Sequence, residues 1–181
     1  MRTLTRGIQR YYLETSAYKK KKVPCVFLDL ASGSESSRVR IKLYDHINPE
    51  ASENFKQICQ GYKLPNGQNL TFTGRKFINS LRNYFVETER MDETIHGGPI
   101  HNETYNVSFD RPGLVGLSQH QTPGDEVSGS GFFITLHKMP NLQKYVAVGE
   151  VIEGLDFVRK CNLADQPLEI KGCGVEGEVS I

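Results

Sequence analysis

The chain has 181 residues, of which 38% are hydrophobic and 24% are charged, and its formal net charge is +1. A chain of this length forms one domain that buries roughly 70% of the surface exposed when it is unfolded. The near-neutral balance excludes a global electrostatic pull toward nucleic acid or an anionic membrane. No apolar run approaches the roughly 18 residues of a membrane span, and no secretory signal core is present. We therefore expect an intracellular protein that is not secreted, has no membrane span and lacks nucleic-acid specificity.

The first 22 residues differ in composition from the rest. They hold seven Lys and Arg residues against one acid, Glu14. On a helical wheel Leu4 and Ile8 lie opposite Arg6 and Arg10. This pattern fits a mitochondrial presequence, an exposed basic arm or an arm that docks on a protein partner. We divide the chain into a basic N-terminal arm, 1–22, and a body, 23–181, and expect a mitochondrial or a cytoplasmic or ciliary location.

Strand patterns begin just after this segment. "CVFLDLA" (25–31) is a compact apolar strand, and "RVRIKLY" (38–44) alternates apolar and basic residues. Alternation with a period of two indicates a strand with one wet face, so these two segments predict an antiparallel pair. Further short strands are predicted in five later segments: 76–89, 113–118, 131–136, 145–151 and 168–181.

Two helices interrupt the strands. In "NPEASENFKQICQG" Asn48 is expected at the N-cap with Pro49 in the first turn, and Gly61 is expected to end the helix. Phe55, Ile58, Cys59 and Tyr62 follow helical spacing. A second helix is predicted over 154–162. Many short strands and two helices favour a closed β-barrel whose open ends the helices cap.

The cysteines are Cys25, Cys59, Cys161 and Cys173, and none forms a CxxC pair. Their spacing predicts buried, reduced thiols and neither a zinc site nor a redox motif. The polar stretch 118–131 contains His120, Asp125 and Glu126. A metal site there is the alternative to a flexible polar loop, and we expect the loop. No metal or cofactor is expected.

The ordered set of segments resembles a cyclophilin over residues 23–181. The most specific strings are "PEASENF" (49–55), "GSGFFI" (129–134) and "VAVGEVIEG" (146–154). The resemblance implies a mainly β fold, a closed eight-stranded antiparallel cyclophilin-like barrel capped by two α-helices. It also implies a family activity, peptidyl-prolyl cis–trans isomerisation. That reaction crosses a barrier of about 20 kcal/mol because the X–Pro amide is resonance-stabilised.

The resemblance also places the site. The family reads F-H-R-I-I-P-G-F-M-x-Q-G-G where this chain reads "FINSLRNYFVETE" (77–89), so the family's catalytic arginine falls on Asn79. Other groove positions change as well: Gly131 replaces a glutamine, and Asn141 replaces a tryptophan. The family's substrate-binding positions fall here on Tyr84, Phe85, Glu87, Ser118, Gln119, Phe133, Leu142 and Tyr145.

An apolar pocket is thus expected without the charged donor. Asn79 can donate a hydrogen bond but carries no charge, and Arg82 falls at the family's Pro-Gly turn, where we expect it to be solvated. We expect a weak or inactive isomerase that acts as a binding or scaffold subunit of a larger organellar or ciliary assembly. The alternative is a divergent but active isomerase that assists protein folding. The expected partners are proteins, either proline-containing segments or a complex docked through residues 1–22, and cyclosporin should bind weakly.

Overall fold

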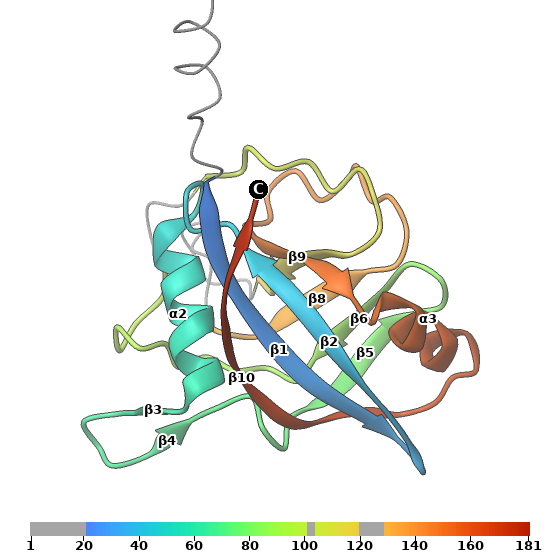
Figure 1. The fold of residues 1–181 in the computed structure, drawn as a ribbon, viewed down its shortest axis with the longest axis horizontal. Helices are drawn as coiled ribbons and strands as arrows, with labels where there is room; N and C mark the ends of the chain where they lie inside the picture. Colours follow the sequence, from blue (N-terminus) through green and yellow to red (C-terminus); the bar gives the residue numbers. More distant parts are fainter. Residues whose placement is uncertain (1–20, 101–103, 120–128) are drawn as a thin grey trace, which may run out of the picture.

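The computed structural model describes residues 21–100, 104–119 and 129–181 (Figure 1). Within these ranges no helix has the length and apolar character needed to cross a membrane. The basic segment 1–20 and most of the 118–131 loop, including His120, Asp125 and Glu126, lie outside the described residues.

Eight strands close into an antiparallel barrel, as predicted. Around the barrel the order is β1-β10-β5-β6-β8-β7-β9-β2. The bounds are β1 Lys22–Ser32, β2 Glu35–Leu43, β5 Lys76–Leu81, β6 Phe85–Thr88, β7 Leu114–Leu117, β8 Phe132–Thr135, β9 Ala147–Glu153 and β10 Leu168–Ser180. Two short strands, β3 Tyr62–Lys63 and β4 Asn69–Leu70, form a separate hairpin.

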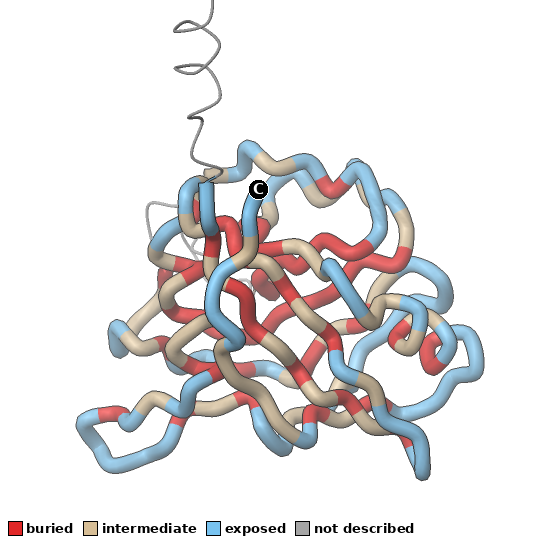
Figure 2. Tube along the Cα trace, in the orientation of Figure 1, coloured by how far each residue is buried: buried red, intermediate tan, exposed pale blue. Residues whose placement is uncertain are grey.

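The helices lie on different sides of the barrel (Figure 1). Helix α2 (Pro49–Gln60) packs mainly against β1 and β10, and α3 (Leu155–Leu163) packs against β6. The buried residues lie mainly in the barrel strands and on α2 (Figure 2). The predicted fold, a barrel with two helices, is confirmed.

Helix α2 begins where the sequence predicts, and Asn48 occupies its N-cap position. It makes no side-chain cap. Its amide donates to the carbonyl of Ala147 at 2.9 Å, and its side-chain oxygen accepts from the backbone N–H of Thr104 at 2.8 Å. Asn48 therefore ties the helix start to β9 and to a loop. Gly61 ends the helix at a φ of 82°, and Tyr62 belongs to β3 instead of the helix.

The main core is built around aromatic rings. Phe132 on β8 lies 5.0 Å from Phe55 of α2 and 5.1 Å from Phe72, measured between ring centroids. Phe77 on β5 meets Phe132 edge-on at 5.8 Å. Tilted and edge-to-face pairs of this kind contribute beyond their buried area. Phe132 therefore joins the helix to the barrel wall.

The first barrel strand begins at Lys22, one residue before the body 23–181 that composition indicated. Lys22 already pairs with Ser180 of β10, and the N–H of Ile181 donates to the carbonyl of Lys21 at 2.8 Å. The two ends of the described body thus lie side by side and form one seam of the sheet. Lys22 therefore belongs to β1, and Lys21 is hydrogen-bonded to Ile181 just beyond the end of β10.

All four cysteines are free thiols. Cys25, Cys59 and Cys161 are buried as expected, but Cys173 on β10 is only partly buried. Its sulfur contacts the hydroxyls of Thr71 at 3.6 Å and Thr73 at 3.4 Å. The expectation of uniform burial is therefore wrong for Cys173.

Candidate functional site

The candidate site lies on the outer face of β8, where alternation separates two neighbouring phenylalanines. Successive side chains of a strand point to opposite faces of the sheet. Phe132 joins the main core, whereas Phe133 joins a second, smaller apolar cluster with Phe109 and Leu114. A pair of adjacent aromatic residues in the sequence thus supplies both the barrel interior and a pocket on its surface.

A cavity of about 130 Å³ opens beside Phe133. Its wall is mostly apolar, and it is lined by Phe85, Glu87, Phe133, Met139, Leu142 and Tyr145. The Phe133 ring meets the Tyr145 ring edge-on, with 5.4 Å between the ring centroids. It also packs against the tilted ring of Phe109, again with 5.4 Å between centroids. Among the described residues that form this cavity, Glu87 carries the one charge.

Gly116 of β7 makes room for the Phe133 ring. A Cβ at this position would lie 2.3 Å from Cζ of Phe133 and 2.8 Å from Cζ of Phe109. Real Cβ atoms essentially never come this close to another heavy atom, so any side chain at Gly116 would displace both rings. The observed position of the Phe133 ring therefore requires glycine at position 116.

A β-bulge positions Asn79. Phe77 pairs with Thr88, while Asn79 pairs with Glu87, so Ile78 is an extra residue on β5. Residues two apart normally share one face of a strand, and the bulge breaks this rule. As a result Phe77 packs against the core while Asn79 lies beside Glu87. Ile78 itself is 68% exposed.

Asn79, Glu87, Phe133 and Gly116 form one row across four strands, β5, β6, β8 and β7. The Asn79 amide donates to Glu87 Oε2 at 2.7 Å, and the Ser118 hydroxyl donates to Glu87 Oε1 at 2.6 Å. Both carboxylate oxygens are thus held by neutral donors. The amide of Asn79, the residue that the resemblance places at the family's arginine position, is thus already engaged by a carboxylate.

Several predicted residues meet at the cavity and others do not. Phe85, Glu87, Phe133, Leu142 and Tyr145 line it, and Ser118 reaches it through Glu87.

Three residues that the resemblance placed in or near the site do not line the cavity. Tyr84 is 44% exposed and packs its ring against His137 at 5.3 Å, away from the cavity lining. Gln119 donates its amide to the carbonyl of Lys144. Arg82 is exposed and contributes nothing to the cavity wall.

One lining residue escaped the sequence analysis. Met139 lies in the segment between β8 and β9, and its N–H donates to the carbonyl of Phe109 at 2.6 Å. Its segment also contains Leu142 and Tyr145, so an apolar side chain there was not distinctive, and neither periodicity nor the family pattern identified Met139.

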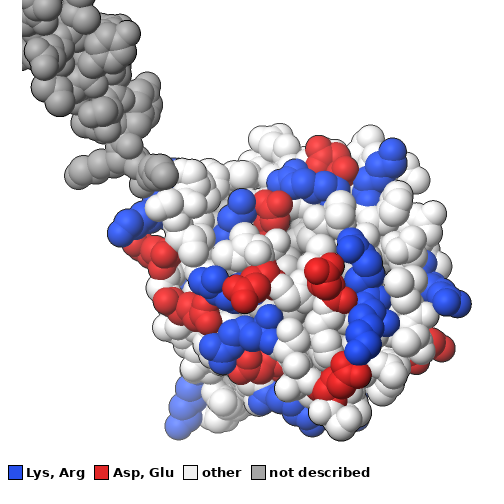
Figure 3. All heavy atoms as spheres, turned by 45° about the vertical axis from the view of Figure 1, so that its right-hand side comes forward, with Lys and Arg blue, Asp and Glu red and all other residues white. Residues whose placement is uncertain are grey.

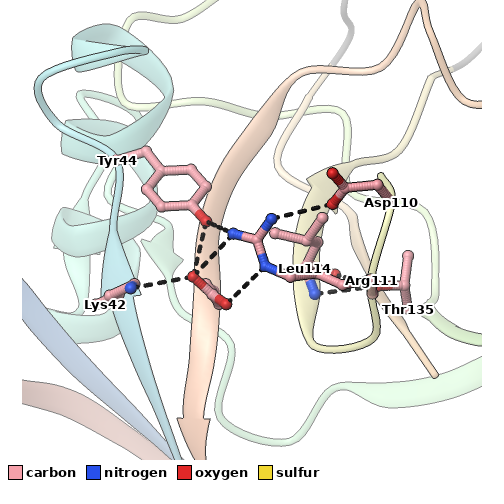
Figure 4. Close-up of polar contacts among 7 residues, drawn as sticks. Lys42, Tyr44, Asp110, Arg111, Leu114 and Thr135 are labelled. Atoms are coloured by element: carbon pink, nitrogen blue, oxygen red, sulfur yellow. Dashed lines mark hydrogen bonds and ion pairs between the residues drawn. The ribbon is translucent and has the colours of Figure 1, made fainter. Parts of the chain in front are cut away.

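An ion-pair network borders the second apolar cluster at Tyr44 (Figure 4). The Tyr44 ring belongs to that cluster, and its hydroxyl donates to Glu150 Oε2 at 3.0 Å. Arg111 reaches Glu150 Oε1 at 3.0 Å, and Lys42 reaches Oε2 at 3.0 Å. Burial opposes ionisation of the Glu150 carboxyl, but hydrogen bonds from these three residues outweigh it and lower its pKa to about 2. Burial, together with Glu150, raises the pKa of Tyr44 above its ordinary value.

Basic residues are plentiful on the surface, but none of the described ones lines the cavity. Figure 3 shows Lys and Arg interspersed with Asp and Glu on the face it presents. Most described carboxylates near basic groups are paired, as in Arg38 with Asp29 at 2.7 Å and Arg40 with Glu176 at 2.6 Å. No Lys, Arg or His among the described residues forms an ion pair with Glu87.

These features define the class of domain: a closed eight-stranded antiparallel barrel with two helices and an apolar pocket on its outer sheet face. The sequence matches the family model described as cyclophilin type peptidyl-prolyl cis-trans isomerase/CLD over residues 27–175. The match spans most of the chain, and the chain therefore belongs to the cyclophilin-type peptidyl-prolyl cis–trans isomerase family.

Proposed function

We propose that this chain is a cyclophilin-fold binding subunit that holds a proline-containing segment of a protein partner and has weak or no isomerase activity. The observation that carries the proposal is the 2.7 Å hydrogen bond from Asn79 to Glu87. An isomerase must hold the twisted amide and weaken its resonance, which a charged donor does best. Here the donor is neutral and one of its hydrogens is already used by a carboxylate.

Magnitudes favour binding over catalysis. A hydrogen bond to a charged group contributes roughly 1.5–3 kcal/mol, against about 1 kcal/mol for a neutral pair. Loss of one preorganised donor at a transition state lowers the rate on the order of 10²–10³-fold. The apolar cavity loses nothing by this exchange, because Phe85, Phe133 and Leu142 still present a pocket of about 130 Å³. A small apolar ring can therefore be bound without being turned over.

The role within a larger assembly rests on composition. The segment 1–22 is basic and suited to docking on a partner, while the body carries the pocket. A scaffold subunit of an organellar or ciliary complex would use both. A divergent, active isomerase is the competing function, and it would use Asn79 with the same pocket.

A titration with a turnover readout separates the two. A short Ala-Pro peptide labelled with ¹⁵N is added to the protein, and NMR follows both binding and cis–trans exchange. We expect saturable shifts without added exchange. Leu142→Ala should weaken binding because it removes one cavity wall, and thermal unfolding of the variant checks that it remains folded. Turnover within tenfold of an arginine-containing cyclophilin, lost in Leu142→Ala, would establish the active isomerase instead.

A further inference from the structure

The carboxylate of Glu87 places a negative charge at the wall of the cavity. Glu87 lies on β6 in the row that includes Asn79 and Phe133, and its side chain lines the cavity. Each carboxylate oxygen accepts one hydrogen bond, from Asn79 at 2.7 Å and from Ser118 at 2.6 Å. A carboxylate oxygen has two lone-pair sites, so each retains capacity for a further donor.

The charge of Glu87 is not balanced by any ion pair within the described part of the chain. Half-buried carboxylates elsewhere in the barrel have cationic partners: Glu150 has Lys42 and Arg111, and Glu176 has Arg40. Glu87 is also half-buried, yet its two partners are neutral donors. Burying a charge is costly unless it is paired, so the site gains from a cation supplied by a ligand.

The cavity wall favours the same charge. Phe85, Phe133 and Tyr145 surround the space next to the carboxylate. The face of an aromatic ring attracts a cation within about 6 Å of its centroid. An anion and several aromatic rings together make a site for an ammonium or guanidinium group, and they disfavour an acidic one.

We propose that the groove selects proline-containing segments that carry a lysine or arginine directly next to the proline, with Glu87 as the specificity-determining residue. This inference rests on the proposed function, because it names the class of segment that the same pocket binds. The proline ring enters the cavity, and the neighbouring basic side chain places its charge against Glu87. Asn79 and Ser118 are positioning residues that hold the carboxylate toward the cavity.

The test compares peptides of equal length that differ at one residue. Four peptides place Lys, Ala or Glu before the proline, or Lys after it, and their dissociation constants are measured by fluorescence anisotropy at low and physiological salt. We expect a Lys peptide to bind about tenfold more tightly than the Ala peptide, the sum of a partly screened ion pair and a cation–π contact. The Glu peptide should bind more weakly than the Ala peptide.

Two variants locate the effect. Glu87→Gln keeps the shape and the capacity to accept hydrogen bonds but removes the charge, and in it the preference for the Lys peptide should fall from about tenfold to the roughly two- to fivefold that a cation–π contact contributes. Glu153→Gln removes the same charge from an exposed residue that pairs with Arg40, away from the cavity lining, and should retain the full preference. Thermal unfolding of both variants confirms that each is folded.

The outcomes are distinct. Equal affinity of the wild-type protein for the Lys and Ala peptides, or a preference that Glu87→Gln leaves undiminished, overturns the charge selection while leaving proline binding intact. Failure of all four peptides to bind overturns the proposed function and this inference together.

Discussion

Asn79 and Glu87 are directly opposite each other on β5 and β6, and the amide of Asn79 donates to the carboxylate of Glu87 at 2.7 Å. The resemblance to the family places its arginine and a groove glutamine at these two positions. In the structure the two residues act as one unit, since the neutral amide of Asn79 holds the carboxylate of Glu87.

This pairing predicts that an arginine introduced at position 79 alone does not raise the isomerase rate. Asn79→Arg places a guanidinium against Glu87, where it forms an ion pair instead of reaching a substrate amide. We expect no measurable gain in isomerase rate from Asn79→Arg. The double variant Asn79→Arg/Glu87→Gln frees the guanidinium and should raise the rate at least about tenfold over wild type.

Exchange spectroscopy on an Ala-Pro peptide measures both variants. Glu87→Gln alone is the matched control and should stay as slow as wild type. A single Asn79→Arg variant as fast as the double variant would show that Glu87 does not sequester the arginine.

The close approach of Gly116 to the Phe133 ring gives a second prediction. Gly116→Ala puts a Cβ 2.3 Å from Phe133 Cζ, which forces the ring away from its position. Overpacking of this kind costs about 1–3 kcal/mol of unfolding free energy, and the displaced ring should also close the pocket to peptides. Urea unfolding and peptide titration measure the two effects.

Gly98→Ala is the control for this substitution. No heavy atom lies within 4 Å of a Cβ built at Gly98. Its unfolding free energy should stay within about 0.5 kcal/mol of wild type. If Gly116→Ala binds peptide as wild type does, Phe133 is not a fixed wall of the site.

The barrel could be predicted from the sequence because the patterns that indicate its strands and helices are local and repeated. Alternating strands such as 38–44 and the Pro49 helix start depend on neighbouring residues, and both are present in the structure. The geometry of the site was harder to predict from the sequence. The bulge at Ile78 depends on pairing with β6, and alternation along "KFINSL" gives no sign of it.

Side-chain directions were the least predictable part. Alignment placed Tyr84 in the pocket wall, yet its ring packs on His137, a residue that comes close only through the tertiary fold. Met139 lines the cavity because its loop folds back, with Met139 N–H bonded to the carbonyl of Phe109. Neither contact follows from spacing in the chain.

The Glu150 network predicts an acid-sensitive contribution to stability. The folded-state pKa of Glu150 is lowered from 4.5 to about 2, so its stabilisation is present above about 4.5 and is lost as the pH falls toward 2. A shift of this size corresponds to roughly 2 kcal/mol after allowance for solvent screening. Urea unfolding between pH 7 and pH 2.5 should show that loss.

Glu150→Gln identifies the source of this effect. The variant should be less stable than wild type at pH 7 but should lose less stability on acidification, so the two curves converge at low pH. Parallel curves for the two proteins would assign the acid sensitivity to other carboxyls.

The N-terminal segment can be removed at a defined point. Because Lys22 pairs with Ser180 and the carbonyl of Lys21 accepts from Ile181, truncation should stop at residue 20. We expect the protein without residues 1–20 to keep its melting temperature within a few degrees and to lose partner association or targeting. Copurification from the native source, read by mass spectrometry, measures the association, and an unchanged complex and location would show that the segment is idle.

The most direct test of the central claim is whether the wild-type pocket binds proline without turning it over. NMR exchange measurements on one Ala-Pro peptide, with an arginine-containing cyclophilin alongside at equal concentration, give the answer in a single experiment. The account predicts saturable binding by both proteins and an isomerisation rate at least about 10²-fold lower for this chain. Comparable rates from the two proteins would contradict it.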